Sequence, residues 1–161
     1  MKNTMLLSGA LLLVGLASDE RRTGMKHINP PGLPRPNGYS HVVEVGAGRT
    51  IYVSGQVAMD GAGDVVGPGD IKAQTHQVFE NLKAALGAAD ATLGQVVKIT
   101  VFMTDVSQLA GFREVRDTYF TETPPASSLV EVKRLVRPEL LIEIEAVAFV
   151  APAAQGAPLS R

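Results

Sequence analysis

The chain contains no cysteine and no tryptophan, and aromatic residues make up only 5% of its 161 residues. Without cysteine, disulfides, thiolate catalysis and thiolate metal ligands are all excluded. So few aromatic side chains argue against a platform on which nucleic-acid bases stack. The formal net charge is −1, so no overall positive field attracts a polyanion. The composition therefore disfavours cysteine chemistry and nucleic-acid binding.

The composition is instead that of one packed globular domain. Apolar residues make up 45% of the chain and charged residues 19%, which is typical of a protein with a hydrophobic core and untypical of disorder. A chain of this length accommodates a single domain. We place that domain at residues 25–150 and expect the alanine- and proline-rich tail 151–161 to be disordered.

The first 24 residues differ from the rest. Lys2 precedes the apolar run 5–17, and a charged cluster follows at 19–22. This order is typical of a secretory signal peptide, and the run is shorter than the about 20 residues that span a bilayer. The alternative is that translation begins at Met25. The first reading predicts an exported or periplasmic protein without a membrane segment in its mature form, and the second a cytoplasmic one.

Hydrophobic periodicity predicts the secondary structure of the remaining chain. The proline-rich segment 29–37 is expected to be an extended arm. Two β-branched runs joined by a glycine-bearing loop at 46–49 predict a hairpin. Asp70 and Ser107 are expected to cap the two helices. The predicted strands are 41–45, 50–54, 95–103, 128–135 and 140–149, and the predicted helices are 71–86 and 107–120.

This order, ββ-α-β-α-ββ, predicts an α/β (α+β) domain with a single mixed sheet and two helices on one face. The helices then leave the other sheet face without cover from its own chain. Because the last strand alternates apolar residues with others, that face is not fully polar, and we expect it to bind a second copy of the chain.

The usual cofactor motifs are missing. The glycines near Gly61 do not have the spacing of a phosphate-binding loop. His27, His41 and His76 lie in different predicted elements without metal-ligand spacing. No G-x-S-x-G elbow is present either, because Ser54 lies in V-S-G-Q.

Two features suggest chemistry. Glu143 and Glu145 lie two residues apart on one predicted strand, so their carboxylates share a sheet face about 7 Å apart. They form either a solvated face or an acid/base carboxylate at a subunit seam. Ser54 and Gly55 lie at a strand end, where glycine allows a ligand to approach the backbone, or simply marks a bulge.

Residues 29–150 resemble the Rid (YjgF-type) family. The resemblance rests on several short sequence motifs that occur in the family's order and with the family's spacing. They are NGYS (37–40), VSGQ (53–56), AQTHQVFENLKAAL (73–86), VVKITVFMTD (96–105), VEVKRL (130–135) and IEIEAVA (142–148).

The resemblance implies a chorismate-mutase-like fold and a homotrimer whose sheets face the central axis, with three clefts between subunits. Well-known members hydrolyse 2-imino acids to 2-keto acids and ammonia without a metal or organic cofactor. The partner implied is a small-molecule ligand, such as an imine, enamine or carbonyl metabolite. Two alternatives stay open: a trimer that binds such a ligand without catalysis, and endoribonuclease activity, which the weak net charge disfavours.

The resemblance also assigns roles to individual residues. Tyr39 would cover the cleft, and Ser54 and Gly55 would line its floor. Glu143 would position or activate the attacking water, as the catalytic residue. Leu129 would offer main-chain polar groups to the substrate.

At two further positions the chain departs from the family. Deaminating members have an arginine in a P-A-R-S motif, and this chain has Ser127 at that position. At the second position, Arg113 stands where the family leads us to expect an asparagine. An arginine holds a carboxylate through two parallel charge-assisted hydrogen bonds, whereas a serine offers one neutral bond. Leaving a substrate carboxylate unpaired costs on the order of 3–5 kcal/mol. Arg113 either supplies the missing cation from another direction or is a solvent-facing helix arginine.

We predict that the mature protein begins between Ala17 and Met25, through signal cleavage or a start at Met25. The intact mass of the protein from its native host measures this directly, and cell fractionation then distinguishes the two routes. Retention of Met1 would contradict both.

Overall fold

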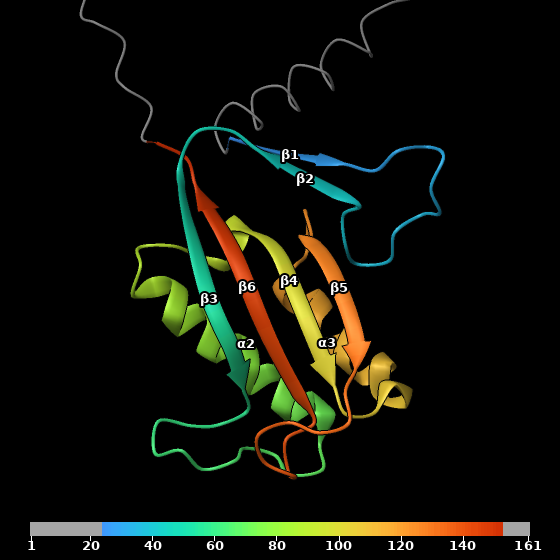
Figure 1. The fold of residues 1–161 in the computed structure, drawn as a ribbon, viewed down its shortest axis with the longest axis vertical. Helices are drawn as coiled ribbons and strands as arrows, with labels where there is room; N and C mark the ends of the chain where they lie inside the picture. Colours follow the sequence, from blue (N-terminus) through green and yellow to red (C-terminus); the bar gives the residue numbers. More distant parts are fainter. Residues whose placement is uncertain (1–23, 153–161) are drawn as a thin grey trace, which may run out of the picture.

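The computed structural model describes residues 24–152. Its main sheet has the strand order β3-β6-β4-β5 (Figure 1). The strands are β3 (Arg49–Val57), β6 (Ile142–Val150), β4 (Val96–Met103) and β5 (Ala126–Glu131). β4 and β5 run parallel, while β6 is antiparallel to both β3 and β4. The predicted mixed sheet is confirmed. The predicted signal segment and tail lie outside the described residues, apart from Gly24 and residues 151–152.

Two helices, α2 (Ile71–Gly87) and α3 (Leu109–Tyr119), cover one face of this sheet (Figure 1). The Asp70 carboxylate accepts hydrogen bonds from the backbone N–H groups of Lys72 and Ala73, so it caps α2 as predicted. The cap before the second helix is Asp105 rather than Ser107. Its carboxylate accepts a hydrogen bond from the Ser107 N–H and begins the 3-10 turn η2 (Val106–Gln108), which leads into α3.

The core lies between the helices and the sheet. Alternate residues of β4 and β6 point into it, and the apolar stripe of α2 packs against them. Gln74 is fully buried in this core, but both polar atoms of its side-chain amide have hydrogen-bond partners. Its amide nitrogen donates to the carbonyls of Gly67 and Glu139, and its amide oxygen accepts from the Leu141 N–H. Fully buried members of the core include Val78, Phe79, Leu82, Leu86, Val101, Met103, Ile142 and Ile144.

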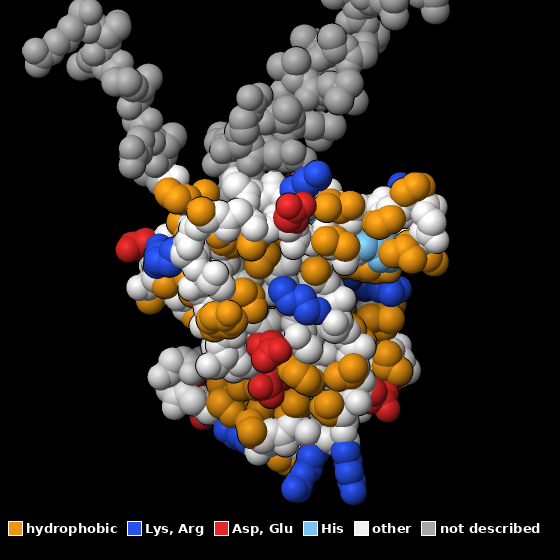
Figure 2. All heavy atoms as spheres, turned by 45° about the horizontal axis from the view of Figure 1, so that its top comes forward, with side chains coloured by type: hydrophobic (Ala, Val, Ile, Leu, Met, Phe, Trp, Pro, Cys, Tyr) orange, Lys and Arg blue, Asp and Glu red, His pale blue; other side chains and the backbone are white. Residues whose placement is uncertain are grey.

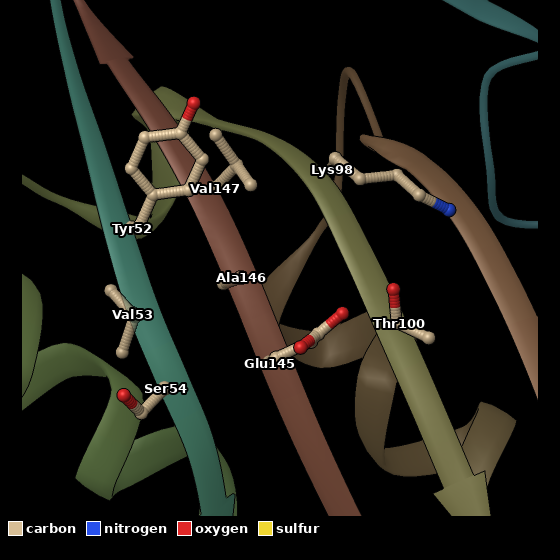
Figure 3. Close-up of a pocket in the computed structure, with 8 residues that line it drawn as sticks. All are labelled: Tyr52, Val53, Ser54, Lys98, Thr100, Glu145, Ala146 and Val147. Atoms are coloured by element: carbon tan, nitrogen blue, oxygen red, sulfur yellow. The ribbon is translucent and has the colours of Figure 1, made fainter.

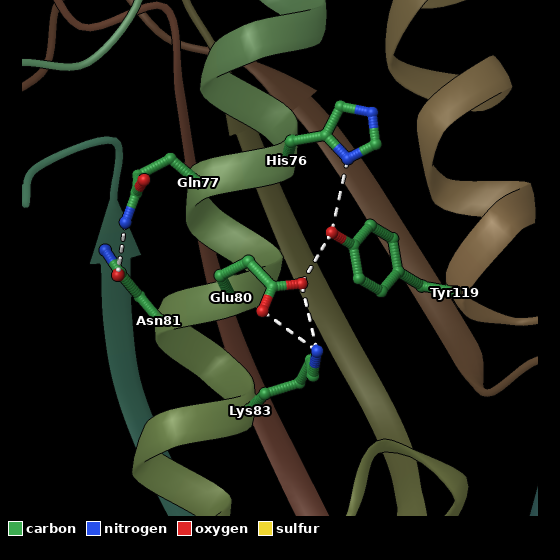
Figure 4. A network of polar contacts seen from close by, with 6 residues as sticks. All are labelled: His76, Gln77, Glu80, Asn81, Lys83 and Tyr119. Atoms are coloured by element: carbon green, nitrogen blue, oxygen red, sulfur yellow. Dashed lines mark hydrogen bonds and ion pairs between the residues drawn. The ribbon is translucent and has the colours of Figure 1, made fainter.

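A polar and aromatic network joins α2 to α3 (Figure 4). The Tyr119 ring stacks on Phe79 with centroids 4.6 Å apart, and its hydroxyl donates to the Glu80 carboxylate at 2.8 Å. Burial, and then the hydrogen bond to Glu80, raise the pKa of Tyr119 to about 12. Hydrogen bonds from Lys83 and Tyr119 lower the pKa of Glu80. These contacts hold α3 against α2.

The predicted hairpin is wrong. β2 (Val42–Val45) pairs with β1 (Met25–Ile28) in a separate two-stranded sheet, whereas β3 pairs with β6. Two adjacent β-branched runs are a local signal and do not specify which strand each run pairs with. Here β3 forms a long antiparallel ladder with β6, so the loop at 46–48 carries the chain from one sheet into the other. β1 itself was not predicted.

The predicted strand 128–135 also needs correction, because β5 ends at Glu131. β5 does not lie beside β6, since β4 separates them. The connection β4-α3-β5 is a helical crossover, which is what a parallel pair requires. The segment around Pro138 connects β5 to β6 and carries the chain past β4, so these two strands do not form a hairpin.

The sheet face opposite the helices has no cover among residues 24–152. Tyr52 on β3 is 81% exposed. A hollow of about 400 Å³ on this face is lined by residues of β3, β6 and β4, including Lys98 and Glu145 (Figure 3). Lys98 donates to the Ser128 hydroxyl, and burial lowers the pKa of Lys98 while Glu145 partly offsets the effect. Figure 2 shows hydrophobic side chains interspersed with charged ones on this side of the molecule.

No helix within the described part of the chain combines the length and apolar character needed to cross a bilayer.

From the open sheet face and the family resemblance we predict a trimer in solution, with about three times the mass of one chain. Multi-angle light scattering at micromolar concentration measures this. A monomer would contradict the prediction, because the apolar side chains of the face would then have no partner.

Candidate functional site

The predicted site residues fall into two groups in one protomer. Tyr39, Arg113, Ser127 and Leu129 line a single cleft of about 230 Å³. Ser54, Gly55 and Glu143 lie elsewhere, on β3 and β6. We call the first the α3–β5 cleft and the second the β3–β6 group.

The α3–β5 cleft lies between the edge strand and the second helix. Ser127 is paired in register with Ile99, and Leu129 with Val101, whose side chains are buried beneath the helices. Ser127 and Leu129 therefore face the helix side of the sheet. Phe112 and Arg113 come from α3 and form the opposite wall.

Arg116 holds the loop that carries Tyr39. Its guanidinium is bonded to the Asp117 carboxylate at 2.6 Å and donates to the Asn37 carbonyl at 3.5 Å, and Arg116 is only 4% exposed. Gly38 adopts φ +70°, and any Cβ at that position would overlap the Arg116 guanidinium. The loop therefore requires glycine both for its backbone conformation and for this contact.

Ser40 attaches the same loop to the strand that bears Ser127. Its N–H donates to the Pro125 carbonyl at 2.9 Å, and its hydroxyl donates to the Pro124 carbonyl at 2.6 Å. Gly38, Ser40 and Arg116 were missed by the sequence-based prediction. The available signals were the Asn37-Gly38 turn dipeptide and the position of Arg116 one helical turn after Arg113.

Arg113 is one of the residues that line the cleft. Its Nε is buried and has no hydrogen-bond partner in the described part of the chain, whereas the residue as a whole is half-buried. A role of Arg113 as a substitute cation and a role as a solvent-facing helix arginine therefore both stay predictions.

The β3–β6 group is built on a bulge. The register between β3 and β6 shifts between Val53 and Gln56, so Ser54 and Gly55 lie in the irregular segment. A Cβ on Gly55 would overlap a carboxylate oxygen of Glu143. The bulge reading of this glycine is confirmed, and the Glu143 side chain lies in the space that a Cβ would fill. Approach of a ligand to the backbone here stays a prediction.

Glu143 and Glu145 share the open sheet face, as predicted, because the intervening Ile144 is fully buried. They differ in surroundings. Glu143 lies against Gly55, whereas Glu145 faces the hollow with Tyr52, Lys98 and Thr100 (Figure 3).

One protomer does not bring the two groups together. β3 and β5 are the opposite edges of the sheet, and three strand spacings of roughly 4.8 Å separate them by about 14 Å. The groups also lie on different faces, since Ser127 is on the helix side and Glu143 on the open side. A site that contains both groups requires a second copy of the chain.

Comparison with known proteins gives consistent matches. The domain model described as "Endoribonuclease L-PSP" matches residues 33–150. A RutC family protein of Pyrococcus horikoshii is 44% identical over 117 residues, covering 72% of this chain and 90% of that protein. The 2-iminobutanoate/2-iminopropanoate deaminase of Escherichia coli is 40% identical over 112 residues, covering 67% and 85%. The crystal structure of a conserved Rid family protein from Yersinia pestis, titled as being of unknown function, superposes with a TM-score of 0.74 at 39% identity, covering 79% and 99%.

We predict that Gly55→Ala leaves the fold intact but lowers ligand affinity or turnover at least tenfold. The new methyl group would displace the flexible Glu143 side chain, and a misplacement of about 1 Å can cost roughly a hundredfold in rate. Gly61→Ala is the matched control, because a Cβ at Gly61 meets no atom within 4 Å. Circular dichroism and thermal melting check the fold of both variants. Equal function in the two would contradict a role for the Gly55–Glu143 contact.

Proposed function

The chain belongs to the Rid (YjgF-type) family, whose domain model covers residues 33–150, and we propose that it is a cofactor-free hydrolase of small imines and enamines. The reaction would take place in clefts between the subunits of a homotrimer. Relatives named 2-iminobutanoate/2-iminopropanoate deaminase, from Escherichia coli and Mus musculus, support this reaction class.

The observation that carries the proposal is the division of the site into two complementary halves on opposite sheet edges. The α3–β5 cleft offers a binding surface with an aromatic wall and a cation. The β3–β6 group offers a carboxylate beside a glycine. Neither half is sufficient for hydrolysis, and a neighbouring subunit can complete each of them.

In the proposed mechanism, Glu143 accepts a proton from a water as the water oxygen attacks the imine carbon. Glu143 passes that proton to the imine nitrogen, which gives a carbinolamine. In the second step the C=O bond forms and the C–N bond breaks, while Glu143 transfers the carbinolamine hydroxyl proton to the nitrogen, which leaves as ammonia. The sum is one imine plus one water giving one carbonyl compound and ammonia. Tyr39 would cover the substrate, Ser54 and Gly55 would line the floor, and the Leu129 main chain would orient it.

The second candidate is a trimer that binds a small ligand without turning it over. Ser127 favours it, because a neutral hydroxyl stands where deaminating members carry the arginine that orients the substrate carboxylate. Endoribonuclease activity, the name of the matching domain model, has less support: a net charge of −1 provides no field for a polyanion.

We predict that the wild-type protein hydrolyses 2-iminopropanoate at least a hundredfold more slowly than relatives with the arginine. We also predict that Ser127→Arg recovers part of that loss. An arginine that holds the substrate carboxylate acts by positioning and charge, and the resemblance implies that Tyr39, Ser54, Gly55 and Glu143 match the family. Recovery should be incomplete because Arg113 lines the same cleft and would repel a second guanidinium.

The measurement is a coupled assay in which an amino-acid oxidase generates the imine and its decay is followed with and without protein. Glu143→Gln in the Ser127→Arg background should abolish the gain. A wild-type rate equal to that of a relative would refute the arginine argument. If Ser127→Arg assembles normally and gains nothing, the non-catalytic binding function is favoured instead.

A further inference from the structure

Arg116 is a charged side chain on the buried side of α3. The buried residues of this helix are Phe112, Val115 and Arg116, and Arg116 is only 4% exposed. Removing a guanidinium from water costs free energy, and replacing a buried ion pair by apolar residues of similar volume is often neutral or stabilising. The stability of the core therefore does not explain an arginine at this position.

The Arg116 guanidinium ties α3 to the loop that carries Tyr39. Its Nε and one terminal nitrogen donate to the Asp117 carboxylate at 2.8 and 2.6 Å, and these two bonds fix the plane of the group. The same terminal nitrogen reaches the Asn37 carbonyl at 3.5 Å and fills the space where any residue other than Gly38 would carry its Cβ. The guanidinium thus joins the helical wall of the α3–β5 cleft to the loop beside it.

Tyr39 is held on its other side as well. Ser40 donates from its N–H to the Pro125 carbonyl and from its hydroxyl to the Pro124 carbonyl. The rings of Tyr39 and His41 meet edge to face, with centroids 5.2 Å apart and planes at 82°. These contacts fix the end of the loop next to β5, and its beginning is fixed from α3. The half-buried Tyr39 side chain in the cleft lining is thereby held between the two walls.

We infer that Arg116 is a positioning residue for Tyr39, so that the affinity of the α3–β5 cleft for its ligand depends on Arg116 through Tyr39. The guanidinium is engaged by Asp117 and by the loop, and its part is to keep the loop in place. A wall that is already ordered when the ligand arrives lowers the entropic cost of binding. The inference rests on the ligand-binding cleft of the proposed function and adds a residue that acts on this cleft from behind Tyr39.

The first test separates positioning from stability with Arg116→Met in the full-length protein. Methionine is unbranched and apolar, and the Asp117 side chain is 54% exposed, so thermal melting should show unchanged or higher stability. The Ser40 N–H should nonetheless exchange with solvent at least tenfold faster. The NMR ring signals of Tyr39, assigned among the three tyrosines with Tyr39→Phe, should also move. Arg134→Met removes a charge from an exposed residue outside the cleft and should change neither measurement.

A double-mutant cycle with 2-oxobutanoate as the probe tests whether Arg116 acts through Tyr39. Calorimetry should show at least tenfold weaker binding in Arg116→Met and in Tyr39→Ala. Adding Arg116→Met to Tyr39→Ala should cost less than a further twofold, because the side chain that Arg116 positions is then gone. Arg116→Lys keeps the charge but loses the planar fork, and should retain part of the affinity.

Unchanged Ser40 exchange and Tyr39 signals in a folded Arg116→Met protein would overturn the inference. A loss of affinity that persists in full in the Tyr39→Ala background would also overturn it, because Arg116 would then contact the ligand directly. If Arg116→Met does not fold, Arg116→Lys decides in its place, since it should show the same changes at smaller size. A wild-type protein that does not bind 2-oxobutanoate would count against the proposed function, and the exchange and ring-signal measurements would still decide the role of Arg116.

Discussion

The strand order β3-β6-β4-β5 is the constraint on which the rest of this structure depends. It places the strand that bears Ser54 and Gly55 and the strand that bears Ser127 and Leu129 at opposite edges of one sheet. Both helices pack on the same face, against the buried residues that recur at alternate positions along β4 and β6. The opposite face is left open, and the two groups of predicted site residues lie apart on the sheet. Both features follow from the same topology.

Two glycines allow close contacts in these groups, Gly55 in the β3–β6 group and Gly38 beside the α3–β5 cleft. At Gly55 the absence of a Cβ lets the Glu143 carboxylate lie against the backbone of β3. At Gly38 the Arg116 guanidinium occupies the space of the missing side chain and holds the Tyr39 loop. In both places a charged side chain lies where any residue other than glycine would carry its Cβ. Arg116 has this structural role, whereas the Nε of Arg113, one helical turn earlier, has no hydrogen-bond partner among residues 24–152.

Much of this could be read from residue patterns. The helix 71–86, its Asp70 cap and the common face of Glu143 and Glu145 follow from periods of 3.6 and 2 residues, which depend only on local backbone geometry. Pairing could not be read in this way. The runs at 41–45 and 50–54 were expected to form a hairpin, yet they belong to different sheets. β5 was expected to be longer, and it pairs with β4 in parallel across a helix. A strand's partner is determined by distant segments that compete for its edge, and local periodicity carries no information about them.

The sequence by itself determined the fold class, and with the family resemblance it named the predicted site residues, because these depend on residue type and order along the chain. Only the tertiary structure decided how those residues are grouped. It separated Glu143 from Ser127 across the sheet and placed Arg113 and Ser127 in the lining of one cleft. Within the described residues it also gave Arg116 an ion-pair partner and left the Nε of Arg113 without a hydrogen bond. The physical reason is that burial and charge compensation are properties of neighbours in space, and those neighbours are contributed by segments far apart in the chain.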